Sequence, residues 1–237
     1  MATLRRRGFQ GVALSELLDG WEGKAELPAR PLVLTFDDAF RSVHERAAPV
    51  LAELGFRATV FAVSGHVGRT NDWPTQPEGV PRLPLCTWEE LRGLARIAEV
   101  GAHGVDHRPL LESLDPPALR REVFDSRRAL EDGLGLPVTL FAYPYGAHGP
   151  SAREAVRAHY RAACGVRLEK ASPDRDRHDL ARIDAYYLRP GAATRLFGTV
   201  AGDTYLALRA LGRRARARAA APPYRAGVAA PSGDERG

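Results

Sequence analysis

The chain has 237 residues, of which 44% are hydrophobic and 27% charged, proportions typical of a globular protein with its own apolar core. The length suits one α/β domain followed by a tail. Cys86 and Cys164 are far apart and show no CxxC spacing, which argues against a disulfide framework and a zinc finger. No apolar run has the length of a transmembrane helix, and the N-terminus lacks the apolar stretch of a signal peptide. We therefore expect a cytoplasmic protein, or an extracytoplasmic one if the natural start lies upstream.

The net charge of +5 is concentrated at the C-terminal end of the chain. From Arg209 onward there are seven arginines and two acidic residues, while the basic and acidic residues before Arg209 balance. Because the folded part carries no positive excess, we expect no nucleic-acid partner. Composition divides the chain into a domain over residues 1–208 and a basic tail over 209–237. A helix is predicted over 205–220, and disorder over 221–237.

The first half of the chain alternates predicted strands and helices. Residues 32–36 form a short apolar run that predicts a buried strand. Residues 40–54 follow with apolar positions at helical spacing, and Gly55 is placed to end that helix. Residues 58–63 predict the next strand. Residues 64–85, rich in Gly and Pro, predict a long loop over one end of the fold.

A second series of elements follows this loop. Thr87 and Glu90 have the spacing of a capping box, so we expect a helix to begin there. Residues 98–102 predict a strand. Asp115, which precedes two prolines, predicts the start of a helix that runs to about Gly133.

The last series predicts strands over 138–142, 161–165 and 181–188, a turn at 143–146 and a helix over 150–159. Strands that alternate with helices indicate an α/β fold with a parallel sheet or barrel. We find no internal repeat.

Two adjacent carboxylates, Asp37 and Asp38, come directly after the first predicted strand. In α/β folds the carboxyl ends of parallel strands carry the active site. One carboxylate of such a pair can ligate a metal while the other stays ionised and acts as a base. The alternative interpretation is that the pair only caps the following helix.

Two histidines, His103 and His107, follow the strand predicted over residues 98–102. Imidazoles four residues apart can lie on one face of a helical turn and bind one cation. The spacing alone is a weak signal, and the alternative is two loop histidines near the surface. The signal is stronger here because the carboxylate pair would meet the histidines at the same edge of the sheet.

A third motif, Tyr143-Pro144-Tyr145-Gly146, follows the strand predicted over 138–142. Aromatic rings with Pro and Gly form a rigid turn, which can offer a flat wall to a sugar and a backbone N–H to an oxyanion. The alternative is a packed turn without a binding role.

Together these residues resemble the polysaccharide deacetylase family, also called carbohydrate esterase family four. The resemblance covers about residues 8–190 and rests on strings in family order: TFDDAF, APVLAELGFRATVFAV, TWEELRGLA, EVGAHGVDH and FAYPYGAH. It implies an irregular (β/α) barrel of about seven parallel strands. The family's first strand is either absent or encoded upstream of Met1. The FAYPYG form is similar to the branch that contains poly-N-acetylglucosamine deacetylases.

The resemblance also implies roles for single residues. Asp37 matches the catalytic base, and the metal ligands match Asp38, His103 and His107. Tyr145 matches the residue whose backbone N–H binds the oxyanion. The expected metal is Zn²⁺, with Co²⁺, Ni²⁺ or Fe²⁺ as alternatives.

Several positions depart from the family pattern. Ala39 stands where the family usually has Gly, and Gly104 replaces a Ser or Thr that could steady the ligand loop. Ala142 stands near the place of an arginine that orients the base. We predict that Arg182 substitutes for it, since a cation beside Asp37 would lower its pKa; the alternative is a surface charge.

Four further residues are predicted to contact substrate: Trp73 in the long loop, Tyr143 and Pro144 in the third motif, and His148 just after it. The histidine that acts as general acid in the family is not visible, so the acid is unassigned.

The sequence thus favours a metal-dependent hydrolase that removes an acetyl group from an N-acetylated amino sugar in a glycan or glycoside. Two alternatives stay open. One is a hydrolase of a non-sugar amide or imide on the same scaffold, and the other is a non-catalytic carbohydrate-binding relative. The oligomeric state is not indicated.

Overall fold

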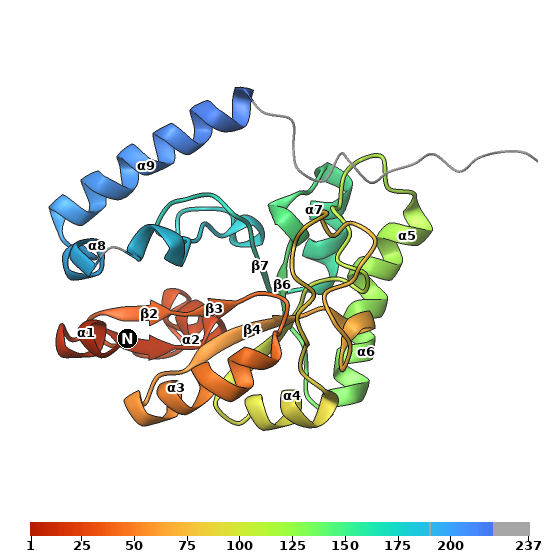
Figure 1. Ribbon diagram of the computed structural model, residues 1–237, viewed down its shortest axis with the longest axis horizontal. Helices are drawn as coiled ribbons and strands as arrows, with labels where there is room; N and C mark the ends of the chain where they lie inside the picture. The colour runs from red at the N-terminus through yellow and green to blue at the C-terminus, as the bar shows by residue number, and fades with distance from the viewer. Residues whose placement is uncertain (190, 220–237) are drawn as a thin grey trace, which may run out of the picture.

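A five-stranded parallel sheet forms the centre of the molecule in the computed structural model, which describes residues 1–189 and 191–219 (Figure 1). Its order is β3–β4–β5–β6–β7, so each strand pairs with its neighbour in sequence. The bounds are β3 Thr35–Phe36, β4 Ala58–Ala62, β5 Ala98–Ala102, β6 Leu140–Ala142 and β7 Ala162–Cys164. The sheet curls into half a barrel, which is the incomplete, irregular α/β barrel that the sequence predicts.

A second parallel pair, β1 Gln10–Val12 and β2 Pro31–Val33, lies beside the main sheet and brings the strands described to seven. The run predicted as one strand over residues 32–36 is therefore divided at Leu34 between the two sheets. The carbonyl of Leu34 accepts the N–H of Thr59 at 2.8 Å, so the chain remains attached to β4 where it changes partner.

Both faces of the main sheet are covered, which explains its apolar strands. All five residues of β4 are buried. Val60 and Ala62 pack with the helices on the outer face, whereas Phe61 belongs to the cluster on the inner face. Gly101 of β5 makes room for Phe61, since a Cβ at that position would lie 2.6 Å from the phenyl ring.

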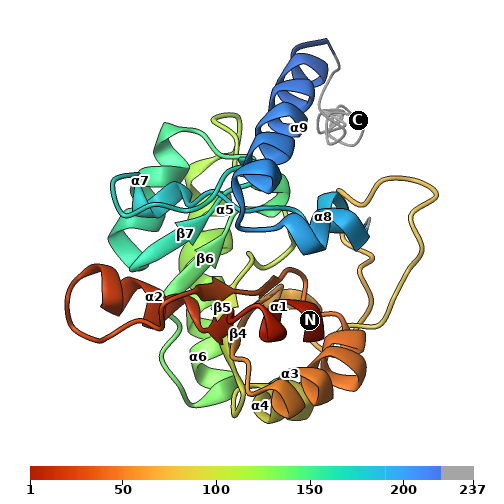
Figure 2. The same cartoon turned by 90° about the vertical axis from the view of Figure 1, so that its left-hand side faces the viewer.

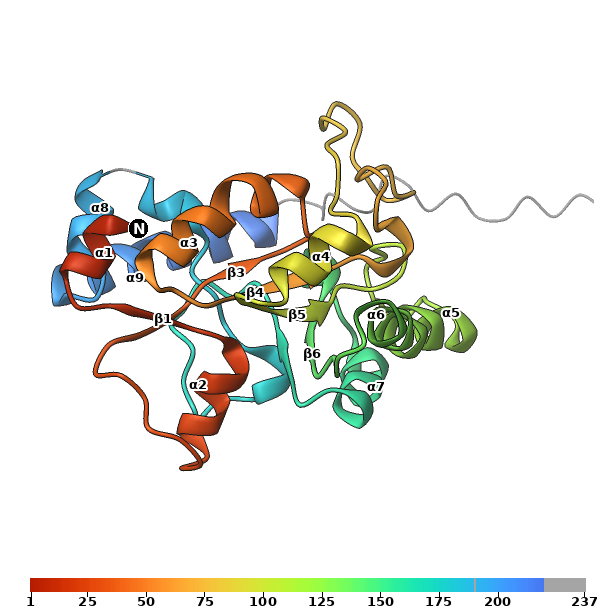
Figure 3. The same ribbon diagram turned by 90° about the horizontal axis from the view of Figure 1, so that it is seen from below.

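Four helices cover the outer face: α3 (Ala48–Leu54), α4 (Trp88–Leu94), α6 (Ser126–Leu134) and α7 (Pro150–His159) (Figure 3). The predicted helix over 40–54 consists of a π-helical turn, Val43–Ala47, and α3, Ala48–Leu54; it ends at Gly55, whose φ of 63° is left-handed. Helix α4, Trp88–Leu94, begins with the predicted capping box, in which the Glu90 N–H donates to Thr87 Oγ1 at 3.2 Å.

The helix predicted after Asp115 is also present, in three consecutive segments. These are α5 Pro116–Arg120, a π-helical turn Arg121–Asp125 and α6 Ser126–Leu134. Helix α7, Pro150–His159, has the predicted bounds.

The inner face is covered by the N-terminal segment, which the sequence patterns did not predict. Helix α1 spans Ala2–Arg6, and α2 spans Leu14–Trp21 (Figure 2). Leu14, Leu17 and Leu18 of α2 pack on the inner side of the sheet. A three-residue strand such as β1 is too short to give a periodic pattern.

The strand predicted over residues 181–188 is wrong. Leu180 makes one bridge to Cys164, and a 3₁₀ helix over Ala185–Leu188 then replaces the strand. The side chain of Asp184 accepts the N–H of Tyr186 at 2.8 Å and so caps this turn. A local side-chain cap thus competes with the sheet ladder and ends it.

Helices α8, Gly191–Leu196, and α9, Val200–Ala219, complete the described chain. The helix predicted over 205–220 is present as α9 but begins earlier. The proposed domain boundary after residue 208 falls inside it, and the disorder predicted over 221–237 lies outside the described residues. Within the described parts, none of the helices combines the length and apolar character that a membrane crossing requires.

Candidate active site

Three side chains converge at the carboxyl end of the sheet. Asp38 follows β3, while His103 and His107 follow β5. Asp38 Oδ1 lies 3.5 Å from His103 Nε2 and 3.4 Å from His107 Nε2, and the two Nε2 atoms are 3.2 Å apart. Among the residues that the structure describes, these three side chains form a cluster whose ligand atoms are close enough together to hold one metal ion.

The hydrogen bonds around this triad suit a divalent metal. The Nδ1 atom of His103 lies 2.7 Å from the carbonyl oxygen of Ala142, which can only accept, so this nitrogen carries the proton and Nε2 presents a lone pair. Asp38 Oδ1 is buried with no hydrogen-bond donor. Two imidazoles and one carboxylate are the donors that Zn²⁺, Co²⁺, Ni²⁺ and Fe²⁺ accept.

Burial shifts the pKa values of the Asp38 carboxylate and the His107 imidazole in opposite directions. Burial raises the pKa of Asp38 to about 6, with Asp37 adding to the rise and His103 and Arg182 opposing it. Burial and the neighbouring His103 hold the pKa of His107 well below its ordinary value, so its imidazole is neutral at neutral pH. A neutral imidazole is the form that binds a metal.

Asp37 forms a bidentate ion pair with Arg182. Nη1 of the arginine is 2.6 Å from Oδ1 and Nη2 is 2.9 Å from Oδ2. The arginine is fixed in turn, because its Nε donates to the carbonyl of Gly165 at 2.9 Å and its Nη1 to Thr35 Oγ1 at 3.2 Å. Burial raises the pKa of Asp37, but the charges of Arg182 and His103 outweigh it, so the pKa lies below its ordinary value.

The backbone at the site is unusual. Among the described residues, the non-glycine positions with a left-handed φ are Asp38, Ala39, His107 and Tyr145, with values from 53° to 67°. All four belong to the three sequence motifs. Backbone strain of this kind concentrates at functional sites, where it directs side chains that a relaxed turn would not.

Aromatic rings support His107. Its ring lies 4.3 Å from Trp73 and 4.5 Å from Tyr145, measured between centroids. Trp73 Nε1 donates to the Tyr145 hydroxyl at 3.2 Å, and that hydroxyl donates to the carbonyl of Thr75 at 2.9 Å. Trp73 is only 3% exposed, so the structure places it behind a ligand; its predicted contact with substrate stays a prediction.

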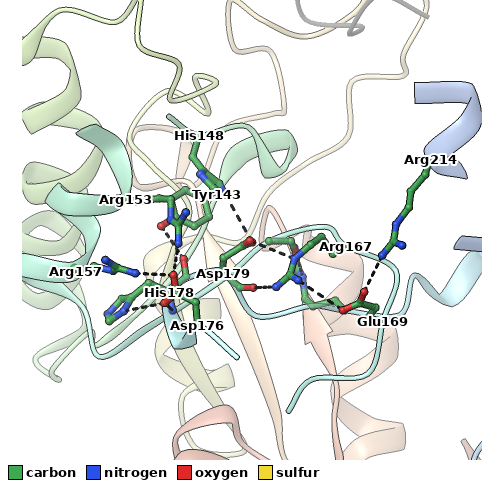
Figure 4. A network of polar contacts seen from close by, with 12 residues as sticks. Tyr143, His148, Arg153, Arg157, Arg167, Glu169, Asp176, His178, Asp179 and Arg214 are labelled. Carbon is green, nitrogen blue, oxygen red and sulfur yellow. Dashed lines mark hydrogen bonds and ion pairs between the residues drawn. The ribbon is translucent and has the colours of Figure 1, made fainter. Parts of the chain in front are cut away.

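The remaining predicted substrate contacts, in and just after the third motif, are buried or half-buried. Tyr143 and Pro144 are buried, and the Tyr143 hydroxyl donates to the carbonyl of His178 at 2.9 Å. His148 stacks on Tyr143 with ring centroids 4.3 Å apart and faces Asp179, with Nε2 3.7 Å from Oδ1 (Figure 4). The predicted contact of these three residues with substrate stays a prediction.

Figure 4 shows how the segment after β7 is tied to this turn. Asp179 also pairs with Arg167 at 3.3 Å, and Asp176 pairs with Arg157 at 2.7 Å and with Arg153. Glu169 carries the network on to α9 through Arg214 at 2.8 Å. The same segment leads to Arg182, so these ion pairs help to place the partner of Asp37.

A cavity of about 830 Å³ opens on the inner side of the half barrel. Apolar side chains from the N-terminal and C-terminal segments line most of it, among them Leu14, Trp21 and Phe197. Asp37 and Arg182 reach its wall, whereas none of the three clustered ligands does. The ion pair therefore separates the cavity from the metal-ligand cluster.

Comparison with known proteins gives the family. The polysaccharide deacetylase family model matches residues 24–163, more than half of the chain. The chain belongs to this family.

Deacetylases of bacterial polysaccharides are among its relatives. The poly-beta-1,6-N-acetyl-D-glucosamine N-deacetylase of Escherichia coli is 31% identical over 106 residues, which cover 43% of this chain and 16% of that protein. The protein of the same name from Staphylococcus aureus is 23% identical over 152 residues, or 60% of this chain and 49% of that one. The chain therefore spans half or less of these relatives.

Solved structures agree on the fold. IcaB from Ammonifex degensii superposes with a TM-score of 0.64 at 26% identity, covering 82% of this chain and 83% of that one. The deacetylase PplD of Streptococcus pyogenes, determined with acetate, gives a TM-score of 0.66 at 21% identity, covering 77% and 76%.

The sequence patterns did not predict one buried side chain of this member of the polysaccharide deacetylase family, that of Glu122. Glu122 lies in the π-helical turn between α5 and α6, and its carboxylate accepts backbone N–H groups of the loop that joins His103 to His107. A glutamate within an amphipathic helix gives no sign of burial, so only the three-dimensional arrangement reveals it.

Proposed function

We propose that this protein is a metal-dependent N-deacetylase, which hydrolyses the acetamide of an N-acetylated amino sugar in a glycan or glycoside. The observation that carries the proposal is the cluster of Asp38, His103 and His107 beside an Asp37 that is ionised and oriented by Arg182. The names of the relatives support the substrate class.

The division of labour between the two carboxylates follows from their surroundings. Asp38 lies with the imidazoles and would hold the metal with them. A metal held there would lower the pKa of water and polarise the amide carbonyl. Asp37 has its own cation in Arg182, which keeps the carboxylate ionised and free to accept the proton of the attacking water at one of its Oδ atoms.

The oxyanion that forms during attack on an amide needs a donor. We assign this role to the backbone N–H of Tyr145. The residue sits at the carboxyl end of β6 with a φ of 57°, and its ring is fixed by bonds to Trp73 and Thr75. A rigid donor costs no reorganisation when the charge develops.

The test is acetate release from N-acetylglucosamine oligomers of increasing length, from N-acetylated glycosides and from a panel of cyclic imides. We expect activity with the N-acetyl sugars that chelation removes and that zinc or cobalt restores. An Asp37→Asn variant should bind metal and release almost no acetate. Glycan binding without acetate release at every metal concentration would contradict the proposal, as would turnover of imides alone.

A further inference from the structure

The carboxylate of Glu122 lies directly behind the loop that carries the second histidine. The side chain is 0% exposed. Its Oε2 accepts the N–H of Val105 at 2.9 Å and that of Asp106 at 3.2 Å, and its Oε1 accepts the latter also at 3.2 Å. A buried carboxylate is costly unless it is hydrogen-bonded, so these bonds account for its place.

Gly104 makes this approach possible. Its φ is 81°, and a Cβ at this position would lie 2.4 Å from Glu122 Oε2. The loop therefore has no side chain of its own at residue 104 and is supported by the carboxylate of a neighbouring helix.

The loop is held from the other side as well. The N–H groups of Ser64 and Gly65 donate to the carbonyls of Gly104 and Val105, each at 3.0 Å. Beyond them, Thr75 Oγ1 donates to the carbonyl of His107 at 3.0 Å. Hydrogen bonds thus fix both the carbonyls and the N–H groups of this loop, and they hold His107 in its left-handed backbone conformation.

We propose that Glu122 is a positioning residue, which presets the loop so that the Nε2 atom of His107 meets Asp38 and His103 before a metal binds. The inference rests on the proposed metal site. Outer residues that orient metal ligands typically contribute about 10- to 100-fold to metal affinity, and we expect Glu122 to act in this range.

The experiment measures zinc affinity by competition with a chromophoric chelator. Glu122→Ala should bind zinc about 10- to 100-fold more weakly than the parent protein, because two loop N–H groups lose their acceptor. Glu122→Asp, one methylene shorter, should show the same direction if the alanine variant does not fold. Glu122→Gln should recover most of the affinity, since its amide oxygen can occupy the place of Oε2.

Glu99 offers a matched control. It lies on β5, the same strand that leads to His103, and its Oε2 accepts the N–H of Ser15 at 3.0 Å. Glu99→Ala should lower the melting temperature without changing zinc affinity. The inference is wrong if the Glu122 variants bind zinc like the parent, or if Glu99→Ala weakens binding equally. A parent protein that binds no zinc would overturn the metal site itself together with this inference.

A separate feature lies on α9, whose outward face is apolar. Val200, Leu208 and Leu211 are 85%, 64% and 65% exposed, the highest values among large apolar side chains in the described residues. Their spacing of eight and three residues places them on one face of the helix. The opposite face is packed, with Leu206 and Ala210 buried in the cluster at the N-terminal end.

Arginines flank this apolar stripe. Arg216 and Arg214 lie on its two sides, Arg214 paired with Glu169 at 2.8 Å, while Arg209 is turned toward Tyr187. The sequence from Arg209 onward carries the whole net charge of +5. A second copy of the chain would bring like charges together on this face. An apolar stripe bordered by arginines instead matches helices that lie in the plane of a lipid surface.

We infer that α9 docks on an anionic lipid surface through Val200, Leu208 and Leu211. Sedimentation with phosphatidylcholine vesicles, with and without phosphatidylglycerol, tests this with the full chain. Binding should require phosphatidylglycerol and should weaken as salt is added. Replacing both leucines by serine should reduce partitioning roughly tenfold or more, because both side chains leave the apolar layer.

Leu136→Ser is the matched control, since Leu136 is 49% exposed on the turn after α6 and lies outside the stripe. This variant should bind vesicles like the parent. The inference fails if vesicles are not bound, or if the leucine substitutions have no effect on binding. It also fails if the protein binds DNA and not vesicles. It fails too if the parent is a dimer and the leucine-to-serine variant is a monomer.

Discussion

The two halves of the site are built in different ways. On the ligand side, Asp38, His103 and His107 follow strands of the main sheet and lie within two short motifs. On the base side, Asp37 depends on Arg182, which is 145 residues away in sequence and lies in a segment without regular structure. The ligand side is therefore fixed by the sheet, whereas the base side is fixed by a network of ion pairs.

Among the substitutions that test this difference, removal of a metal ligand should reduce activity the most. We expect Asp38→Ala to abolish both zinc binding and acetate release, because two imidazoles alone leave an incomplete donor set. Equilibrium dialysis followed by metal analysis measures the first and acetate release the second. Full activity in a chelated sample of this variant would contradict the metal role of the cluster.

Removing the base should separate chemistry from binding. Asp37→Asn should lower kcat by about 10²- to 10⁴-fold, the range of a general base, while zinc affinity stays near that of the parent. An equal loss of zinc affinity would show that Asp37 is a ligand, and the division between the carboxylates would then be wrong.

Removing the arginine should have a smaller effect with a distinct pH signature. The charge of Arg182 keeps the pKa of Asp37 low against the effect of burial, and only the ionised carboxylate accepts a proton. In Arg182→Gln the pKa of Asp37 rises, so the acid limb of kcat/KM should move to higher pH. We expect a loss of about 10-fold near neutral pH, because an ionisable base remains.

Arg189→Gln is the control for that substitution, since Arg189 stacks on the exposed Tyr186. Its pH profile should equal that of the parent. An unchanged acid limb in Arg182→Gln would show that the base titrates independently of the ion pair.

The smallest predicted effect concerns the third motif. Tyr143→Phe removes the hydrogen bond to the carbonyl of His178 and should lower the free energy of unfolding by about 1 kcal/mol, with KM unchanged. Chemical denaturation and steady-state kinetics measure the two quantities. A large rise in KM with unchanged stability would instead support the predicted contact between Tyr143 and substrate.

Sequence patterns predicted the elements whose signals are local. The capping box at Thr87 and Glu90, the glycine end at Gly55 and the strand ends that carry the motifs all depend on neighbours within a few residues. The family resemblance added the expectation of a cation near Asp37. The assignment to the FAYPYG branch stays a prediction.

Features that depend on distant partners were missed. The last predicted strand fails for a local reason instead, since the side chain of Asp184 caps a 3₁₀ helix where the pattern predicted a strand. Burial of Glu122 could not be inferred, since its carboxylate serves N–H groups from another segment. Burial of Trp73 likewise depends on rings brought to it by the fold.

The left-handed residues at the site have a consequence for how this protein tolerates mutation. A left-handed conformation costs a non-glycine residue roughly 1–2 kcal/mol, and four such residues together approach the net stability of a typical domain. Interactions elsewhere in the fold must offset this cost. We therefore expect a narrow margin for sequence drift, in which core substitutions far from the site reduce the fraction of folded, active molecules.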